Sequence, residues 1–206
     1  MPQKFDVESW RKWKKIFEDG EDVVISEKIH GQNARFVFDG ETMHYGSRTQ
    51  WKKPGDKCFW FVAVQNNPWI ESWCKANPKI YLFGEGFGNT DLKYAVPNGK
   101  VGFRAFDAWD SESRSFWDYD RFVESVKEFC SIEDIQGNCY IGGIAPVLYR
   151  GPYNEEIVRQ CTDGQSTMPG VNHIREGCVI KTTKEKISHF GRHCLKNVSN
   201  EYLMRT

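Results

Sequence analysis

The chain has 206 residues, and its 28 Lys and Arg side chains balance 28 Asp and Glu side chains. A neutral net charge gives no general attraction to nucleic acids or membranes, so any nucleic-acid surface must be a local patch. No apolar run approaches the roughly 18–20 residues of a membrane span, and the N-terminus lacks the apolar core of a signal peptide. The seven cysteines are widely spaced without a CxxC pair, which favours reduced thiols over disulfides or structural zinc and predicts a cytoplasmic protein.

The predicted elements alternate between helices and strands along the chain. Apolar side chains at helical spacing predict an amphipathic helix with a basic outer face over residues 8–18. The β-branched run from Val23 to Ile25 predicts a buried strand, and Asp39-Gly40 predicts a hairpin turn. Further strands are predicted at residues 34–38, 43–45, 80–83, 101–109, 146–152 and 175–181, helices at 57–77, 119–130 and 153–161, and a loop at 162–173.

Glu27, Lys28 and His30 follow the first predicted strand directly. A lysine just past a buried strand is placed to be partly desolvated, which favours the neutral amine that acts as a nucleophile. The alternative is a surface lysine that extends from the strand end and pairs with Glu27. Taken alone, the local pattern favours the surface lysine, because lysines are rarely buried.

Several more charged side chains stand at predicted strand ends. No nucleophile elbow with a positioned histidine, HExxH, Walker A or kinase signature is present. A lysine nucleophile, acidic groups able to hold Mg²⁺ and additional cations suit a phosphoryl transfer, in which negative charge builds on phosphate oxygens. The residues that would form such a group are Lys28, Arg48, Glu85, Asp107, Glu176, Lys181 and Lys196.

Six short motifs containing these residues occur in a fixed order. They are Glu27-Lys28-Ile29-His30-Gly31-x-Asn33, Ser47-Arg48, Phe83-Gly84-Glu85-Gly86-Phe87-Gly88, Phe103-Arg104-Ala105-Phe106-Asp107, Glu176-Gly177-Cys178-Val179-Ile180-Lys181 and Leu195-Lys196-Asn197. They resemble motifs I, Ia, III, IIIa, IV and V of the lysine-dependent nucleotidyltransferases, and within these the RNA ligases of the T4 RNA ligase 2 type. Each motif alone is weak, but six in order favour Lys28 as a nucleophile.

The resemblance implies an α+β fold: a nucleotidyltransferase (ATP-grasp-like ligase adenylation) domain with two antiparallel sheets and flanking helices around an ATP groove. It implies that residues 1–206 form a single adenylyltransferase domain without a separate C-terminal domain. The implied activity is ATP-dependent RNA ligation. Lys28 attacks the α-phosphorus of ATP and expels pyrophosphate, AMP passes to a 5′-phosphate, and a 3′-OH displaces AMP and seals the strand.

The resemblance also implies roles for individual residues and a need for Mg²⁺ or Mn²⁺. Catalytic roles fall to Lys28, Lys181 and Lys196, and the metal is expected at Glu176. ATP-binding roles fall to Glu27, Ile29, Asn33, Arg48, Glu85, Phe106, Lys181 and Lys196, with Arg48 and Glu85 on the ribose and Phe106 on adenine.

Motif V departs from the family, because the first of its two usual lysines is replaced by Cys194. We expect Arg192 or His193 to take the place of this lysine. If neither does, the first step, transfer of AMP to Lys28, is expected to be weaker. The substrate is expected to be RNA, as a nicked duplex or free ends, with a DNA-containing duplex as an option. We expect the RNA to be bound by two basic regions: residues 181–206, which hold six Lys and Arg against two Glu, and the helix at 10–15. The alternative is that a partner protein binds it.

Other activities remain open from the sequence. Within the same chemistry, these are a DNA ligase and an RNA-capping guanylyltransferase. A non-catalytic nucleic-acid-binding protein that kept the fold is a third, although the intact set of Lys28, Glu85, Glu176 and Lys181 argues against it. We expect a monomer in the cytoplasm, consistent with a bacterial or phage-infected cell.

Overall fold

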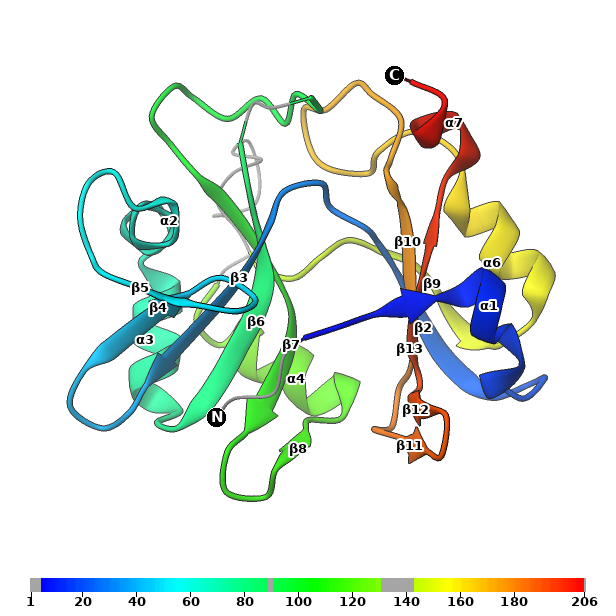
Figure 1. Ribbon diagram of the computed structural model, residues 1–206, viewed down its shortest axis with the longest axis horizontal. Coiled ribbons are helices and arrows are strands. Elements are labelled where there is room, and N and C mark those ends of the chain that lie inside the picture. Colours follow the sequence, from blue (N-terminus) through cyan, green and yellow to red (C-terminus); the bar gives the residue numbers. More distant parts are fainter. Residues whose placement is uncertain (1–4, 89–90, 131–142, 206) are drawn as a thin grey trace. The chain divides into compact units, whose positions relative to one another are not determined.

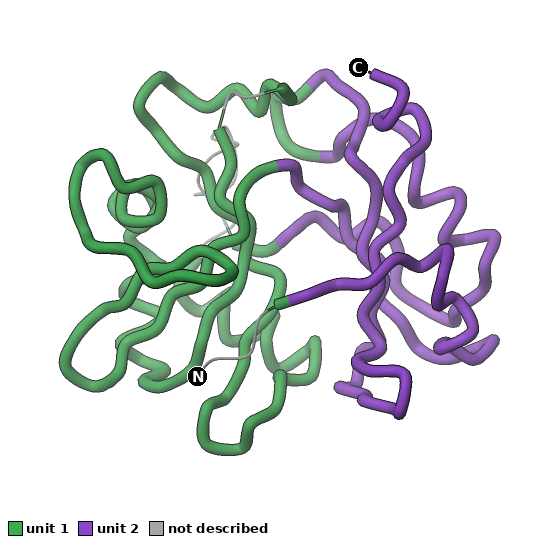
Figure 2. The backbone as a smooth tube through the Cα atoms, viewed as in Figure 1, with its two compact units in different colours: residues 1–5, 31–144, 168–171 green, residues 6–30, 145–167, 172–206 purple. Residues whose placement is uncertain are grey.

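The computed structural model describes residues 5–88, 91–130 and 143–205 (Figure 1). The chain divides into two compact units (Figure 2). Unit 1, drawn in green, comprises residues 1–5, 31–144 and 168–171, and unit 2, in purple, comprises residues 6–30, 145–167 and 172–206. Within the described ranges, no helix is long and apolar enough to cross a membrane.

Unit 1 is built on a six-stranded antiparallel sheet with the strand order β5-β4-β3-β6-β7-β8. The strands are β3 (Gln32–Phe38), β4 (Met43–Gly46), β5 (Trp51–Lys52), β6 (Ile80–Phe87), β7 (Gly102–Asp110) and β8 (Ser115–Phe116). The helices are α2 (Phe59–Asn66), α3 (Trp69–Ala76) and α4 (Tyr119–Lys127). Aromatic side chains from the sheet and the helices, among them Phe36, Trp73, Phe103 and Phe122, are fully buried in the core of this unit.

Unit 2 is built on a five-stranded sheet with the order β1-β13-β10-β2-β9. The strands are β1 (Glu8–Ser9), β2 (Asp22–Glu27), β9 (Val147–Pro152), β10 (Gly177–Thr182) and β13 (Cys194–Val198), beside a separate ribbon of β11 (Ile187–Ser188) and β12 (Gly191–Arg192). The helices are α1 (Trp10–Trp13), the 3₁₀ turn η1 (Lys14–Ile16), α6 (Glu155–Thr162) and α7 (Asn200–Leu203). Every pair in the five-stranded sheet is antiparallel except β1 with β13.

One face of the unit 2 sheet carries its hydrophobic core. Ile25, Ile180 and Leu195 lie opposite one another across β2, β10 and β13. They pack into a single cluster with side chains such as Trp10 and Val158. Since side chains alternate between the faces of a strand, the next residue of each strand points to the other face.

The helix predicted over residues 8–18 is shorter than expected. Glu8 and Ser9 pair with β13 instead, so the helix begins at Trp10. The regular turn then tightens into η1, and Phe17 is extended with φ −88° and ψ 141°. Strand pairing and burial of Phe17 therefore override the helical pattern of the sequence.

The glycine-rich stretch after Phe83 also differs from the prediction, which ended the strand there. Strand β6 continues through this stretch to Phe87. A Cβ atom at Gly84 would lie 2.2 Å from the ring of Phe103, and one at Gly86 would lie 2.6 Å from the ring of Phe59. The glycines therefore allow aromatic rings to pack directly on the strand backbone.

Candidate functional site

Three predicted catalytic lysines share one face of the unit 2 sheet. Lys181 lies opposite Val24 and Cys194, and Lys196 lies opposite Val179. Because cross-strand partners share a face, both lysines lie on the side away from the hydrophobic core. Lys28 follows Val24 by four residues. Because side chains alternate along β2, Lys28 points to the same side of the sheet as Val24.

Lys28 is held beside the carboxylate of Glu176. Its Nζ atom lies 2.6 Å from Oε1 of Glu176, and Nδ1 of His30 lies 3.3 Å from Oε2 of the same carboxylate. The Lys28 side chain is 23% exposed and that of Glu176 is 12% exposed. An ion pair with this degree of burial is less screened than a surface pair, so Glu176 fixes the end of the lysine side chain.

The backbone around Gly177 determines where Glu176 stands. Gly177 has φ +149°, and a Cβ atom there would lie 2.1 Å from the carbonyl oxygen of Asn197. Only glycine therefore lets β10 approach β13 this closely. The Gly177 carbonyl accepts a hydrogen bond from the Lys28 N–H at 3.0 Å, which aligns Lys28 with the start of β10.

Tyr202 is a further member of this cluster, and sequence reasoning missed it. Its hydroxyl lies 3.0 Å from Nδ1 of His30. The tyrosine sits on α7, whose N-cap Ser199 accepts a hydrogen bond from the Tyr202 N–H. Tyr202 lies beyond the last motif, and no spacing pattern marks it, so only the folded chain reveals its position.

Glu27 does not pair with Lys28, so the alternative pairing considered from the sequence is wrong. Glu27 is 2% exposed. It accepts hydrogen bonds from Ser166 Oγ at 2.6 Å, Thr167 N–H at 2.7 Å and Thr167 Oγ1 at 2.8 Å. Glu27 therefore holds Ser166 and Thr167 at the end of β2, and Lys28 pairs with Glu176 instead. The neighbouring Ile29 is buried.

In unit 1, Asn33 and Glu85 lie directly opposite each other on β3 and β6. Glu85 also lies opposite Arg104 of β7. The Oδ1 atom of Asn33 is buried and has no hydrogen-bond partner among the residues that the structure describes. A buried acceptor left unpaired costs free energy, which favours a ligand that donates a hydrogen bond there.

Phe106 and Arg48 also belong to unit 1. Phe83 pairs with Asp107 and Gly84 with Ala105, so Phe106 is the extra residue of a β-bulge in β7. Its ring centroid lies 4.6 Å from that of Phe5. Arg48 is exposed in the turn between β4 and β5.

Arg192 and His193, the expected substitutes for the missing motif V lysine, are each engaged or buried within unit 2. Arg192 binds Glu185, with Nε–Oε1 at 2.8 Å and Nη2–Oε2 at 2.7 Å. His193 is 3% exposed, and burial lowers the pKa of its imidazole. Cys194 itself is buried opposite Lys181.

The donor set fits a Mg²⁺ or Mn²⁺ ion that is held partly by substrate. Within the described ranges there is no group of three or more His, Cys, Asp or Glu side chains able to enclose a metal. Mg²⁺ is commonly bound by one or two carboxylates together with phosphate oxygens and water. Glu176, whose two oxygens lie beside Lys28 and His30, would supply one such carboxylate.

Comparison with known proteins gives one family and one group of structures. The model of the RNA ligase family matches residues 21–198. No curated protein sequence gives a significant match. The structure of Naegleria gruberi RNA ligase with pyrophosphate matches at 20% identity and a TM-score of 0.79, covering 99% of this chain and 58% of that one.

Two mutant structures of the same Naegleria gruberi ligase match similarly. One, with ATP and Mn, has 20% identity and a TM-score of 0.80, covering 100% of this chain and 59% of that one. Another, with AMP and Mn, has 20% identity and a TM-score of 0.80, covering 100% and 58%. The α+β fold of these ligases is therefore the fold of this chain, which spans less than two thirds of their length.

Proposed function

The chain belongs to the RNA ligase family, and we propose on that premise that it is an ATP-dependent RNA ligase with Lys28 as the covalent carrier of AMP. The observation that carries this proposal is the placement of Lys28. It lies at the end of β2, on the sheet face shared by Lys181 and Lys196, with its Nζ atom held by Glu176 at 2.6 Å.

In the first step, the neutral amine of Lys28 attacks the α-phosphorus of ATP. A phosphorus–nitrogen bond forms, the bond from the α-phosphorus to the bridging oxygen breaks, and pyrophosphate leaves. The amine must first lose a proton, and Glu176 Oε1 is close enough to accept it. AMP then passes to a 5′-phosphate of RNA, from which a 3′-OH displaces it.

Lys181 and Lys196 are proposed to bind the phosphates, because charge grows on phosphate oxygens during the transfer. Both lie on the same sheet face as Lys28. A divalent ion held at Glu176 would neutralise more of this charge.

Residues of unit 1 are proposed to recognise the nucleoside. The unpaired Oδ1 of Asn33 supports a hydrogen bond to the ligand. Glu85, opposite Asn33, and Arg48 are assigned to the ribose hydroxyls, and Phe106, at the bulge of β7, to stacking on adenine. In unit 2, Glu27 and Ile29 would contribute through their backbone, since the carboxylate of Glu27 is occupied.

The biological setting follows from the same proposal. We propose that residues 1–206 act as one monomeric adenylyltransferase domain in the cytoplasm, on RNA as a nicked duplex or free ends. A DNA-containing strand would be a secondary substrate.

Covalent labelling tests the proposal. The protein is incubated with Mg²⁺ or Mn²⁺ and either ATP or GTP carrying a radioactive α-phosphate, then denatured. We expect acid-labile label from ATP on the wild type and on the Lys12→Ala control, which removes an exposed lysine of unit 2. We expect none on Lys28→Ala. Label on Lys28→Ala equal to that on the wild type, or labelling from GTP alone, would contradict the proposal.

A further inference from the structure

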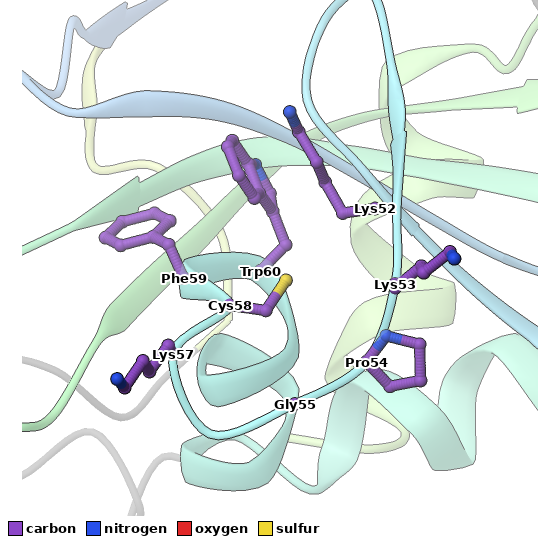
Figure 3. Close-up of a pocket in the computed structure, with 8 residues that line it drawn as sticks. All are labelled: Lys52, Lys53, Pro54, Gly55, Lys57, Cys58, Phe59 and Trp60. Carbon is purple, nitrogen blue, oxygen red and sulfur yellow. The ribbon is translucent and has the colours of Figure 1, made fainter.

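An open hollow lies on unit 1, and none of its lining residues is a predicted site residue (Figure 3). It is formed by β5, the loop that follows and the start of α2, and it is lined by Lys52, Lys53, Pro54, Gly55, Lys57, Cys58, Phe59 and Trp60. Its volume is about 470 Å³, and it is widely open to solvent. We call it the basic hollow.

The basic hollow carries uncompensated positive charge. Lys53 and Lys57 are exposed, and within the described part of the chain neither forms an ion pair. The Lys52 ammonium donates to the Gln50 side chain at 2.9 Å and lies 5.1 Å from the centre of the Trp60 ring. Asp56 is the acidic residue of this loop, so three lysines leave two net positive charges. Such a surface attracts an anion.

Two aromatic rings accompany these lysines. Phe59 and Trp60 are half-buried and meet edge to face, with 5.7 Å between their centroids. Figure 3 shows both rings rising from the start of α2, with the Lys52 side chain beside the Trp60 ring. Aromatic faces beside lysines are the usual platform for single-stranded nucleic acids, whose bases stack while the phosphates contact the cations.

The basic hollow is connected to the strands that carry predicted site residues. The Trp60 indole N–H donates to the Asn33 carbonyl at 3.0 Å. Phe59 packs against Gly86, where any side chain would meet its ring. Gly86 follows Glu85, which lies opposite Asn33. A strand bound in the hollow would therefore lie beside the strands proposed to hold the nucleoside.

We propose that the basic hollow binds a single-stranded segment of the RNA substrate. Lys53 and Lys57 bind successive phosphodiesters, and Phe59 and Trp60 offer stacking faces to a base. The choice of RNA as the polymer rests on the proposed ligase function. An acidic peptide would match the charge but would make no use of the paired rings, so the nucleic acid is the occupant that both features fit.

The test compares RNA binding by two double variants that lose the same charge. The first is Lys53→Ala with Lys57→Ala, and the control is Lys75→Ala with Lys127→Ala, two exposed lysines on α3 and α4 of the same unit. Affinity for a fluorescent 5′-phosphorylated single-stranded RNA is measured over a range of salt concentrations. Labelling with radioactive ATP is measured on the same preparations.

Each phosphate contact with a single strand contributes about 0.7 to the slope of log affinity against log salt. The hollow variant should therefore lose about 1.4 of slope and roughly tenfold or more in affinity at low salt. It should keep AMP labelling, and the control should bind RNA as the wild type does. Equal losses in both variants, unchanged RNA affinity or loss of AMP labelling in the hollow variant would each overturn the proposal.

The two proposals fail separately. A wild type that takes no label from ATP, while RNA affinity still falls in the hollow variant alone, contradicts the ligase function and supports the hollow. If the wild type takes label from ATP but the hollow variant binds RNA as tightly as the wild type does, the ligase function is supported and the RNA site in the hollow is contradicted. Tighter binding of polyglutamate than of RNA would also overturn the hollow as an RNA site.

Discussion

The Nζ atom of Lys28 lies 2.6 Å from Oε1 of Glu176, although 148 positions separate the two residues along the chain. The other carboxylate oxygen lies 3.3 Å from His30, which in turn is 3.0 Å from the Tyr202 hydroxyl. These contacts form a continuous chain of polar groups within unit 2. Two of these groups have replacements of nearly the same shape, Gln for Glu176 and Phe for Tyr202, so their contributions can be tested directly.

Replacing Glu176 by Gln keeps the side-chain shape but removes its charge. We expect AMP labelling of Lys28 to slow by about 100-fold, the lower range for loss of a positioned proton acceptor. Single-turnover labelling at fixed ATP and Mn²⁺ measures this rate. Glu201→Gln removes the same charge from the exposed surface of α7 and should label at the wild-type rate. Equal rates for Glu176→Gln and wild type would remove Glu176 from the first step.

Tyr202→Phe removes the hydroxyl beside His30 and keeps the ring. We expect about a fivefold slower labelling rate, since a hydrogen bond is worth about 1 kcal/mol. If Tyr202 acts by positioning His30, adding Tyr202→Phe to His30→Gln should slow labelling no further. A lower melting temperature with an unchanged labelling rate would show instead that Tyr202 only supports the fold.

Cys194→Lys places a second ammonium group opposite Lys181 on a buried part of the sheet. We expect a lower melting temperature without ATP, because two like charges meet where water is excluded. Added ATP should raise the melting temperature more than in the wild type, since its phosphates would offset the new charge. Cys194→Met, which is long and uncharged, is the control in the same thermal-shift measurement. An ATP effect equal in both variants would place the nucleotide phosphates away from this face.

His193 should make stability depend on pH. Burial lowers its pKa in the folded state below the ordinary value of 6.5. The unfolded chain therefore binds a proton first as the pH falls, so stability is full above about pH 6.5 and decreases as the pH falls through the folded pKa. Urea unfolding at several pH values measures this loss. His193→Gln should lose less stability on acidification than the wild type, and His189→Gln, at an exposed position, should behave as the wild type does.

Much of the sheet framework follows from local pattern. The β-branched run at Val23 places β2, and the alternation around Cys178 and Ile180 places Lys181 on the face away from the core. The sequence pattern predicted these strands because burial of one sheet face requires apolar side chains at every second residue. The motif order then predicted a role for the lysines that share the other face.

Other features depend on contacts between distant residues, which local pattern does not contain. Glu27 was a candidate partner for Lys28, yet Ser166 and Thr167 bind it from a loop more than 130 positions away. The sequence pattern predicted a helix at Glu8 and Ser9, but these residues pair with β13 as a strand. The Tyr202 contact with His30 is of the same kind. The basic hollow arises from a turn and two rings whose packing depends on Gly86.

The strand order of unit 2 also governs when Lys28 acquires its surroundings during synthesis. Strand β2 pairs with β9 and β10, which emerge from the ribosome more than 100 residues later. The strands of unit 1 come from one continuous stretch of the chain. The sheet of unit 2 instead combines strands that precede this stretch with strands that follow it. Domains form from the N-terminus as they are made, and distant pairings form slowly. A nascent chain that ends before Glu176 would therefore carry Lys28, the proposed nucleophile, without this carboxylate and without β10 and β13. We expect such a chain not to react with ATP until these elements have been made.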